Sequence, residues 1–157
     1  MKRRVLAPLF ALMLSCQAMA QGWQPFGVQQ LGFIFDVPPD FVLVERSEAG
    51  DGASFNGPEG AFLAVWGMSL ERSDFRKEIA ARMSEDEVQG WRISYRRITS
   101  NWASYSGTRD GKIRYVRGIA ICGDRAAMFL MDYEKTDKTA YDPIVTRMVR
   151  SLKPEGC

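Results

Sequence analysis

The chain has 157 residues, of which 46% are hydrophobic and 25% are charged, and its formal net charge is +2. This length and composition fit one globular domain with an apolar core. The chain contains no histidine, which excludes Ser-His and Cys-His catalytic arrangements and His-based metal sites. An enzyme with this composition would have to rely on carboxylates, lysine, tyrosine or cysteine.

The first twenty residues have the pattern of a secretory signal peptide. A basic segment, Lys2-Arg3-Arg4, precedes an apolar run over residues 5–14 that is too short to span a bilayer. Ala18-Met19-Ala20 then supplies the small-x-small motif at which such peptides are cleaved. We therefore expect residues 1–20 to be removed after Ala20, and residues 21–157 to form a single domain that is periplasmic or secreted.

A lipid anchor at Cys16 is the alternative. Leu14-Ser15-Cys16 loosely resembles a bacterial lipoprotein box, in which Cys16 would be lipidated and become the new N-terminus. Met13 stands where such boxes usually have leucine, and the Ala-Met-Ala site lies at a normal distance from the apolar run. These two observations favour conventional cleavage.

The positive net charge belongs to the targeting segment. Residues 1–20 contain three basic and no acidic residues, so 21 minus 3 leaves 18 basic against 19 acidic residues and a net charge of −1. This balance gives no global electrostatic case for binding nucleic acid or an anionic membrane surface. No later stretch approaches the length of a transmembrane helix. We expect neither a nucleic-acid partner nor a membrane span in the mature chain.

Two cysteines, Cys122 and Cys157, remain after the predicted cleavage. An even pair in a chain bound for an oxidising compartment predicts a disulfide. The bridge would close a loop of 35 positions, which the chain-entropy model values at roughly 3–4 kcal/mol. Two free thiols and an intermolecular bridge through the C-terminus are the alternatives.

Short apolar segments separated by glycine- and proline-rich turns predict strands along the first half of the mature chain. Phe33, Phe35 and Val37 share one face of their segment, and residues 61–68 are apolar on both faces, as in a central strand. The predicted strands cover residues 21–30, 31–37, 41–45, 53–56 and 61–68.

A helix is predicted in mid-chain, starting at Ser73 or Asp74 and ending at Gly90. Its apolar stripe consists of Phe75, Ile79 and Met83, which recur every four residues. The acidic run Glu85-Asp86-Glu87 is interpreted as a solvated helix face. A calcium site at this run is the disfavoured alternative, because calcium loops need alternating oxygen ligands and a glycine turn.

The second half of the chain predicts an antiparallel meander. Trp91, Ile93 and Tyr95 alternate with polar residues in a half-buried strand, and residues 102–133 then form three more strands. Their turns are Arg109-Asp110-Gly111 and Cys122-Gly123-Asp124.

Within this meander the second and third strands differ in pattern. The second carries an apolar face of Ile113, Tyr115, Ile119 and Ile121 that Arg117 interrupts. The third, residues 126–131, is apolar on both sides and is therefore expected to be central.

A second helix is predicted at the C-terminus. Asp142 is the expected cap, Pro143 the first helical residue and Pro154 the terminator. The predicted fold class is therefore α+β, a twisted antiparallel β-sheet with a mid-chain helix and a C-terminal helix packed on it. Connections between most strands are too short for the crossovers of a parallel sheet.

Four sets of short landmarks lie along residues 25–154. They are Phe33-Ile34-Phe35-Asp36-Val37-Pro38 with Phe41, Asp51-Gly52-Ala53-Ser54-Phe55, Tyr105-Ser106-Gly107 with Tyr115, and Tyr141-Asp142-Pro143-Ile144-Val145 leading to Ser151-Leu152-Lys153-Pro154. In these landmarks the chain resembles the PsbP-like superfamily, the fold of the extrinsic PsbP subunit of the oxygen-evolving complex. The resemblance implies a twisted antiparallel sheet with helices packed on it and a non-catalytic accessory or binding role. It supplies no catalytic or metal-ligating residues, and fold alone does not carry function.

One candidate binding surface is basic. Arg92 and Arg96 have matching parity on their strand, as do Lys112 and Arg114 on a nearby strand. If the strands align, these four side chains form a cationic face, with Trp102 or Tyr105 beside it, that suits an anionic ligand or an acidic partner. The alternative is an exposed sheet face whose cations pair with helix residues such as Glu78 and Glu85.

The sequence thus favours a secreted or periplasmic, non-enzymatic accessory or binding protein, with no catalytic residues, no metal and no cofactor. Its expected partner is an envelope protein. A carboxylate-dependent hydrolase acting on envelope carbohydrate or peptide is an alternative, and it requires two carboxyl groups flanking a cleft. A lipid-anchored structural component of the envelope is the other alternative.

Overall fold

A computed structural model describes residues 22–70 and 74–157, so the predicted signal peptide and Cys16 lie outside the described residues. The described chain contains a small sheet and a large one, both antiparallel. The small sheet has the order β1-β2-β10, with β1 at Gln24–Val28, β2 at Phe33–Val37 and β10 at Lys153–Pro154. The large sheet has the order β3-β4-β5-β9-β8-β7-β6, with bounds β3 Val42–Arg46, β4 Gly52–Asn56, β5 Phe62–Ser69, β6 Arg92–Ile98, β7 Trp102–Arg109, β8 Lys112–Ile121 and β9 Arg125–Glu134.

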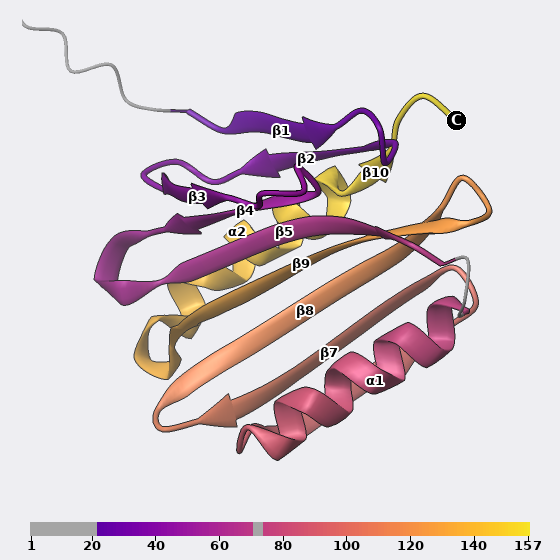
Figure 1. The fold of residues 1–157 in the computed structure, drawn as a ribbon. Helices are drawn as coiled ribbons and strands as arrows, with labels where there is room; N and C mark the ends of the chain where they lie inside the picture. Colours follow the sequence, from indigo (N-terminus) through magenta and orange to yellow (C-terminus); the bar gives the residue numbers. More distant parts are fainter. Residues whose placement is uncertain (1–21, 71–73) are drawn as a thin grey trace, which may run out of the picture.

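Two α-helices lie on opposite faces of the large sheet: α1 at Phe75–Val88 and α2 at Lys138–Ser151. In Figure 1 the small sheet and α2 share one side of the large sheet, and α1 crosses the other side near β7. Short 3₁₀ helices occupy Pro58–Gly60 and Lys135–Asp137. This arrangement confirms the predicted α+β class, with a large antiparallel sheet and one mid-chain and one C-terminal helix.

The predicted meander is formed by β7, β8 and β9. Asp110 and Gly111 join β7 to β8 with φ angles of 50° and 80°, as a two-residue type I′ turn requires. β9 pairs with β5 on one side and with β8 on the other, so it lies in the middle of the large sheet as predicted. Its Met128, Phe129 and Met131 are almost completely buried because both sheet faces are covered.

The two faces of the large sheet carry separate apolar cores. On one face, α1 buries Phe75, Ile79 and Met83, the stripe predicted from the sequence, and each such side chain contributes roughly 1.5–3 kcal/mol. Gly118 of β8 permits this close packing, since a Cβ there would lie 2.8 Å from Cδ1 of Ile79. On the other face, the small sheet buries Phe33 together with the rest of its predicted apolar face.

α1 starts and stops as its capping residues predict. The Asp74 carboxylate accepts a hydrogen bond of 2.9 Å from the backbone N–H of Lys77, which lowers the pKa of Asp74. The helix ends at Val88, and Gly90 follows with a φ of +93°. Among residues 22–70 and 74–157, no helix has both the length and the apolar character that crossing a bilayer demands.

The predicted start of the C-terminal helix is wrong. α2 begins at Lys138, so Pro143 lies inside the helix. Asp142 is therefore not the cap, and it forms an ion pair of 2.8 Å with Lys138. A 3₁₀ turn leads directly into the helix. The first turn is also anchored by Tyr141, which is buried against Tyr133 and donates a hydrogen bond to the carbonyl of Pro58. These tertiary contacts outweigh the local preference for proline at the first helical position.

Cys122 and Cys157 form a disulfide, with their Cα atoms 5.4 Å apart. It joins the turn between β8 and β9 to the segment that follows β10. Beside it, the backbone N–H of Glu155 donates to the carbonyl of Gly32 at 2.8 Å. The C-terminal segment is thereby tied both to the large sheet and to the start of β2.

Candidate functional site

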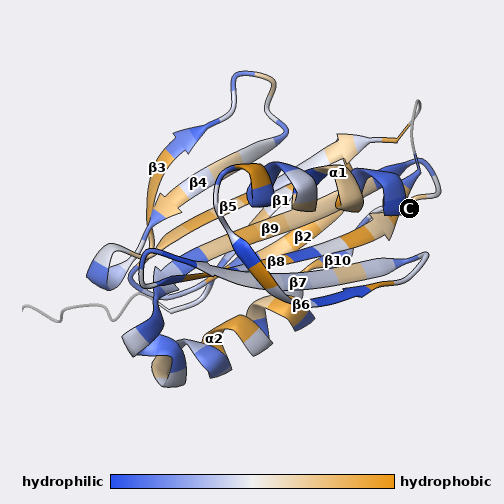
Figure 2. Cartoon of the chain, turned by 90° about the horizontal axis from the view of Figure 1, so that it is seen from below, coloured by the Kyte–Doolittle hydropathy of each residue, from blue (hydrophilic) through white to orange (hydrophobic). Residues whose placement is uncertain are grey.

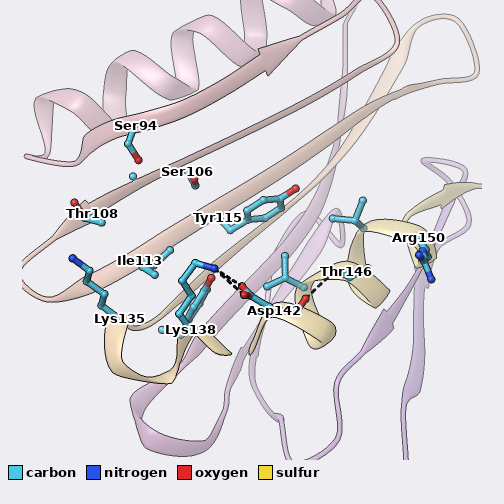
Figure 3. Close-up of a pocket in the computed structure, with 14 residues that line it drawn as sticks. Ser94, Ser106, Thr108, Ile113, Tyr115, Lys135, Lys138, Asp142, Thr146 and Arg150 are labelled. Carbon is cyan, nitrogen blue, oxygen red and sulfur yellow. Dashed lines mark hydrogen bonds and ion pairs between the residues drawn. The ribbon is translucent and has the colours of Figure 1, made fainter. Parts of the chain in front are cut away.

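An open groove of about 780 Å³ lies between α2 and the β6–β8 part of the large sheet. It exists because α2 packs on β2 and β9 and leaves the adjoining strands on that face without a helix above them. Hydroxyl and aromatic side chains of the sheet form its floor, including Ser106, Thr108 and Tyr115. Figure 3 shows these floor residues facing the α2 side chains across the groove.

The groove combines an apolar wall with a cationic rim. Val145 and Val149 of α2 supply apolar lining, and the rim contains the cations Lys135, Lys138 and Arg150. Among the described lining residues, Asp142 is the one carboxylate, and it is held by Lys138. The groove therefore has a positive balance that favours an anionic ligand.

At one end, the floor continues into a small polar cluster on the same face of β6, β7 and β8. The hydroxyl of Tyr115 donates to Oγ of Ser104 at 3.0 Å, and Nη1 of Arg117 donates to the same oxygen at 3.1 Å. Ser104 is buried, and burial raises the pKa of Tyr115, so the phenol remains protonated and able to donate at neutral pH. This hydrogen-bonded chain connects the groove to Arg117.

Two arginines of this cluster approach one tryptophan. The guanidinium carbon of Arg117 lies 4.4 Å from the ring centroid of Trp102, and that of Arg97 lies 5.1 Å from it. Both distances are within the range of cation–π attraction. We refer to Arg97, Trp102, Ser104 and Arg117 as the Arg117 cluster.

No carboxylate among residues 22–70 and 74–157 is within ion-pair distance of Arg97 or Arg117. Nε of Arg117 is buried and has no hydrogen-bond partner in the described chain. Burial lowers the pKa of the Arg117 guanidinium, an effect that the neighbouring Tyr115 and Tyr95 oppose. A cation that is partly desolvated without a counter-charge is unfavourable.

The structure does not bring the four basic residues of the predicted surface onto one face. A β-bulge between Ile93 and Tyr95 reverses the side-chain alternation of β6. Arg92 therefore lies opposite Thr108, on the groove face, whereas Arg96 lies opposite Tyr105, on the α1 face.

The same bulge overturns one further expectation about this strand. Ile93 is paired with Gly107, but Tyr95 is paired with Ser106 and lies on the other face with 47% of its surface exposed. The predicted regular alternation of Trp91, Ile93 and Tyr95 is therefore wrong. The remaining members of the predicted surface, Lys112 and Arg114, lie on the α1 face, where Lys112 pairs with Glu134 at 3.6 Å.

Arg114 is the centre of a buried ion network. Its Nη1 contacts Oδ1 of Asp86 at 2.6 Å, and its Nη2 and Nε donate to Asp132 at 2.7 and 2.8 Å. Tyr105 donates to the other oxygen of Asp86 at 2.6 Å. Burial by itself would lower the pKa of Arg114, but Asp132 and Asp86 outweigh it and the pKa is raised.

Asp86 corrects the interpretation of the acidic run as a solvated helix face. Its side chain is fully buried, while Glu85 and Glu87 are exposed. The helix turns the middle residue of the run toward β7 and β8, where Tyr105 and Arg114 satisfy it. A paired buried carboxylate of this kind supports the α1 face structurally.

Trp91 closes this network from the side of α1. The guanidinium carbons of Arg114 and Arg109 lie 4.2 and 4.7 Å from its ring centroid. Trp91 is 2% exposed and Arg114 9%, so Arg114 presents little surface to a ligand. The predicted binding residue Arg114 is therefore placed in the interior, and Arg117 of the same strand is placed beside the groove.

A signal for Arg117 was present in the sequence. The residue interrupts the apolar face of its strand, and a cation at a core-facing position requires a special environment. Arg97 gave no comparable signal because the bulge in β6 determines the face on which it lies. Ser104 was likewise inaccessible to pattern analysis, since its role depends on the register of three strands.

The groove offers little for cofactor or hydrolytic chemistry. Within the described ranges, no three cysteine or acidic side chains are grouped closely enough to hold a metal ion. Hydrolysis by two carboxylates needs a second acid roughly 5–10 Å from the first, and the described groove lining contains only Asp142, which is engaged by Lys138. The arrangement is suited to holding an anion by charge and hydrogen bonds.

Comparison with known proteins identifies the fold. No protein-family model matches the sequence, and no curated protein matches it. Among solved structures, cyanobacterial PsbP (CyanoP) from Synechocystis sp. PCC 6803 is similar with a TM-score of 0.65 and 11% identity, over 90% of this chain and 97% of that chain. The Ran-binding protein Mog1p of Saccharomyces cerevisiae is similar with a TM-score of 0.59 and 10% identity, over 85% of this chain and 96% of that chain. The predicted PsbP-like resemblance is confirmed at the level of the fold.

Proposed function

We propose that this chain, which has the PsbP-like fold, is an exported, non-enzymatic accessory protein that binds a partner protein through the groove beside α2. The observation that carries the proposal is the cationic groove that runs into the Arg117 cluster, whose two arginines have no counter-charge among the described residues. Open clefts of this kind, with an apolar wall and a few polar groups, are typical binding sites.

The sequence and the cysteines support export. Residues 1–20 have the pattern of a signal peptide, and Cys122 and Cys157 are joined by a disulfide of the kind that persists in oxidising compartments. Lipid anchoring at Cys16 is the competing form of the same proposal. Mass spectrometry of the mature N-terminus distinguishes cleavage after Ala20 from a lipidated Cys16.

Binding is favoured over catalysis by the chemistry of the groove. Its floor hydroxyls lack a histidine or a free carboxylate to activate them, since the chain has no histidine and Asp142 is paired with Lys138. Mog1p, which has a similar fold, is a Ran-binding protein, and this supports a protein partner for the fold. The partner of the present chain is proposed to be an envelope protein.

Site-specific crosslinking in the native envelope tests this proposal. A photoreactive phenylalanine analogue replaces Thr146, which lines the groove and is exposed. The matched control replaces Ala80, which is exposed on α1 at the opposite face. We expect a discrete adduct from position 146 and none from position 80. The absence of an adduct at position 146, or identical adducts at both positions, would contradict the proposal.

A further inference from the structure

We infer that the Arg117 cluster is a carboxylate-binding site and that the occupant of the groove is an acidic peptide segment of the partner. This inference rests on the proposed function, in which the groove is the binding site. It adds the chemistry of the partner and the residues that recognise it.

Strand register places the two arginines on either side of one serine. Arg97 on β6 and Arg117 on β8 are both paired with Ser104 on β7. Their Cα atoms are thus two strand spacings apart, roughly 10 Å, and their side chains project from the same face. The two guanidinium groups converge on the ring of Trp102. Two cations beside one ring repel each other, and an anion that contacts both would relieve that repulsion.

The hydrogen bonding of Arg117 is incomplete. Nη1 donates to Ser104, and within the described chain the guanidinium has no other hydrogen-bond acceptor. Trp102 and Ser104 hold the group in place without neutralising it. Because Nε is buried and Nη1 is engaged by Ser104, a carboxylate would be bound mainly through Nη2, and hydrogen bonds between such charged groups are the stronger kind.

The groove indicates a peptide as the source of that carboxylate. The cluster is joined to the groove floor through Ser104 and Tyr115, and the groove continues along α2 past Val149 and Val145. A volume of about 780 Å³ is far larger than a single carboxylate requires. Apolar lining beside a cationic rim is complementary to an extended segment in which acidic and apolar side chains alternate.

Arginine side-chain NMR tests the inference with a defined probe. The ¹⁵N-labelled protein, purified with its native disulfide, is titrated with the capped peptide acetyl-EVEVE-amide, and the Nε–H resonances of the arginines are followed. We expect those of Arg97 and Arg117 to shift saturably. The resonance of Arg114, which is buried and neutralised, is expected not to shift. Equal shifts of all arginines would overturn the inference.

Matched probes and variants identify what is recognised. The isosteric peptide acetyl-QVQVQ-amide is expected to bind at least roughly tenfold more weakly, since hydrogen bonds between charged groups are lost. The substitutions R117Q and R97Q are each expected to weaken binding of acetyl-EVEVE-amide by roughly tenfold. R76Q, at an exposed position of α1, is the control and should have no effect. Because Arg97 is exposed, R97Q is expected to fold like wild type, so that weaker binding by R97Q reports on the site and not on misfolding.

Other outcomes separate the two proposals. If both peptides bind equally, or if R117Q and R97Q bind like wild type, the carboxylate site is refuted while the crosslink from position 146 can still stand. If acetate alone binds Arg117 as tightly as acetyl-EVEVE-amide does, the site takes a small anion and the peptide inference is overturned. If the peptide binds as expected but position 146 gives no adduct in the envelope, the proposed function is contradicted, whereas the assignment of the Arg117 cluster as a carboxylate-binding site is supported.

Discussion

Arg114 and Arg117 are three residues apart on β8 and lie on opposite faces of the sheet. Each guanidinium stacks on a tryptophan, with distances of 4.2 Å to Trp91 and 4.4 Å to Trp102. Arg114 is neutralised by two carboxylates, whereas no carboxylate of the described chain neutralises Arg117. One strand thus carries a cation paired with carboxylates on one face and, on the other, the cation to which we assign binding.

The two sites also differ in what their loss would leave behind. Removing Arg114 leaves the fully buried carboxylate of Asp86 without its cation. Of the side chains described as donating to it, Tyr105 would remain. Removing Arg117 leaves no opposite charge unpaired among the described residues; the hydroxyl of Ser104 loses a donor and Trp102 loses a cation–π contact. The comparison therefore makes opposite predictions for stability and for binding.

The largest effect is expected for Arg114→Gln. Breaking a buried pair by removing one partner costs roughly 3–5 kcal/mol of unfolding free energy, so R114Q should unfold at a much lower urea concentration than wild type. Urea titration followed by circular dichroism measures this effect. A loss smaller than that of R117Q would show that the Asp86 network is not structural.

Removing the disulfide should come next and should affect neither arginine directly. Replacing Cys122 and Cys157 with serine is expected to lower the unfolding free energy by roughly 3–4 kcal/mol, because the unfolded chain regains the entropy of a 35-residue loop. Urea unfolding without reductant provides the measurement. Wild-type stability in the double variant would mean that the disulfide between the C-terminal segment and the sheet does not stabilise the fold.

The tyrosines extend the comparison to neutral donors. Y105F removes a hydrogen bond to the buried carboxylate of Asp86 and should cost roughly 1.5–3 kcal/mol, whereas Y115F removes one to the hydroxyl of Ser104 and should cost roughly 0.5–1.5 kcal/mol. Thermal and urea unfolding of the two variants give the values. The reverse order would contradict the assignment of the charged network to the α1 face.

The pH dependence of stability supplies a second check on the hydrogen bond between Tyr105 and Asp86. Burial and the hydrogen bond to Asp86 raise the pKa of Tyr105 above its usual value. The folded state therefore keeps the proton at pH values where the unfolded state loses it, and this contribution to stability is lost as pH rises above about 10. Wild type should lose stability over that range more steeply than Y105F. Parallel curves would show that Tyr105 does not contribute.

The smallest change in stability is expected for Arg117→Gln. The variant loses a cation–π contact and one hydrogen bond but also removes an unpaired, partly buried charge, so its unfolding free energy should stay within about 1 kcal/mol of wild type. The same urea titration measures it. A loss comparable to that of R114Q would mean that Arg117 has a structural role, and the contrast between the two faces would disappear.

Local patterns were sufficient to predict the fold class. The apolar alternation of β2, the stripe of α1 and the glycine turns of the meander are properties of short segments, and they led to the strands and the two helices. They did not predict that β1 and β2 form a separate small sheet with β10. The start of α2 was not predictable in this way, because Tyr141 is held by contacts with Tyr133 and Pro58 that are distant in sequence.

The candidate site depended on features that short segments do not contain. A single bulged residue, Ser94, decides on which faces Arg92 and Arg97 lie. The burial of Asp86 depends on how α1 is placed over β7 and β8. Arg117 was visible as an interruption of an apolar face, but its neighbours became known only from strand register. The pattern therefore located an unusual cation, and tertiary structure determined which cations are paired with carboxylates and which are not.

The central claim is that Arg97 and Arg117 recognise an acidic partner in the groove. The most direct measurement is the yield of the crosslink from position 146 in the native envelope, compared among otherwise wild-type protein, R117Q and R76Q. We predict that R117Q lowers the yield by roughly tenfold and that R76Q leaves it unchanged. An adduct of undiminished yield in the folded R117Q protein would contradict the claim.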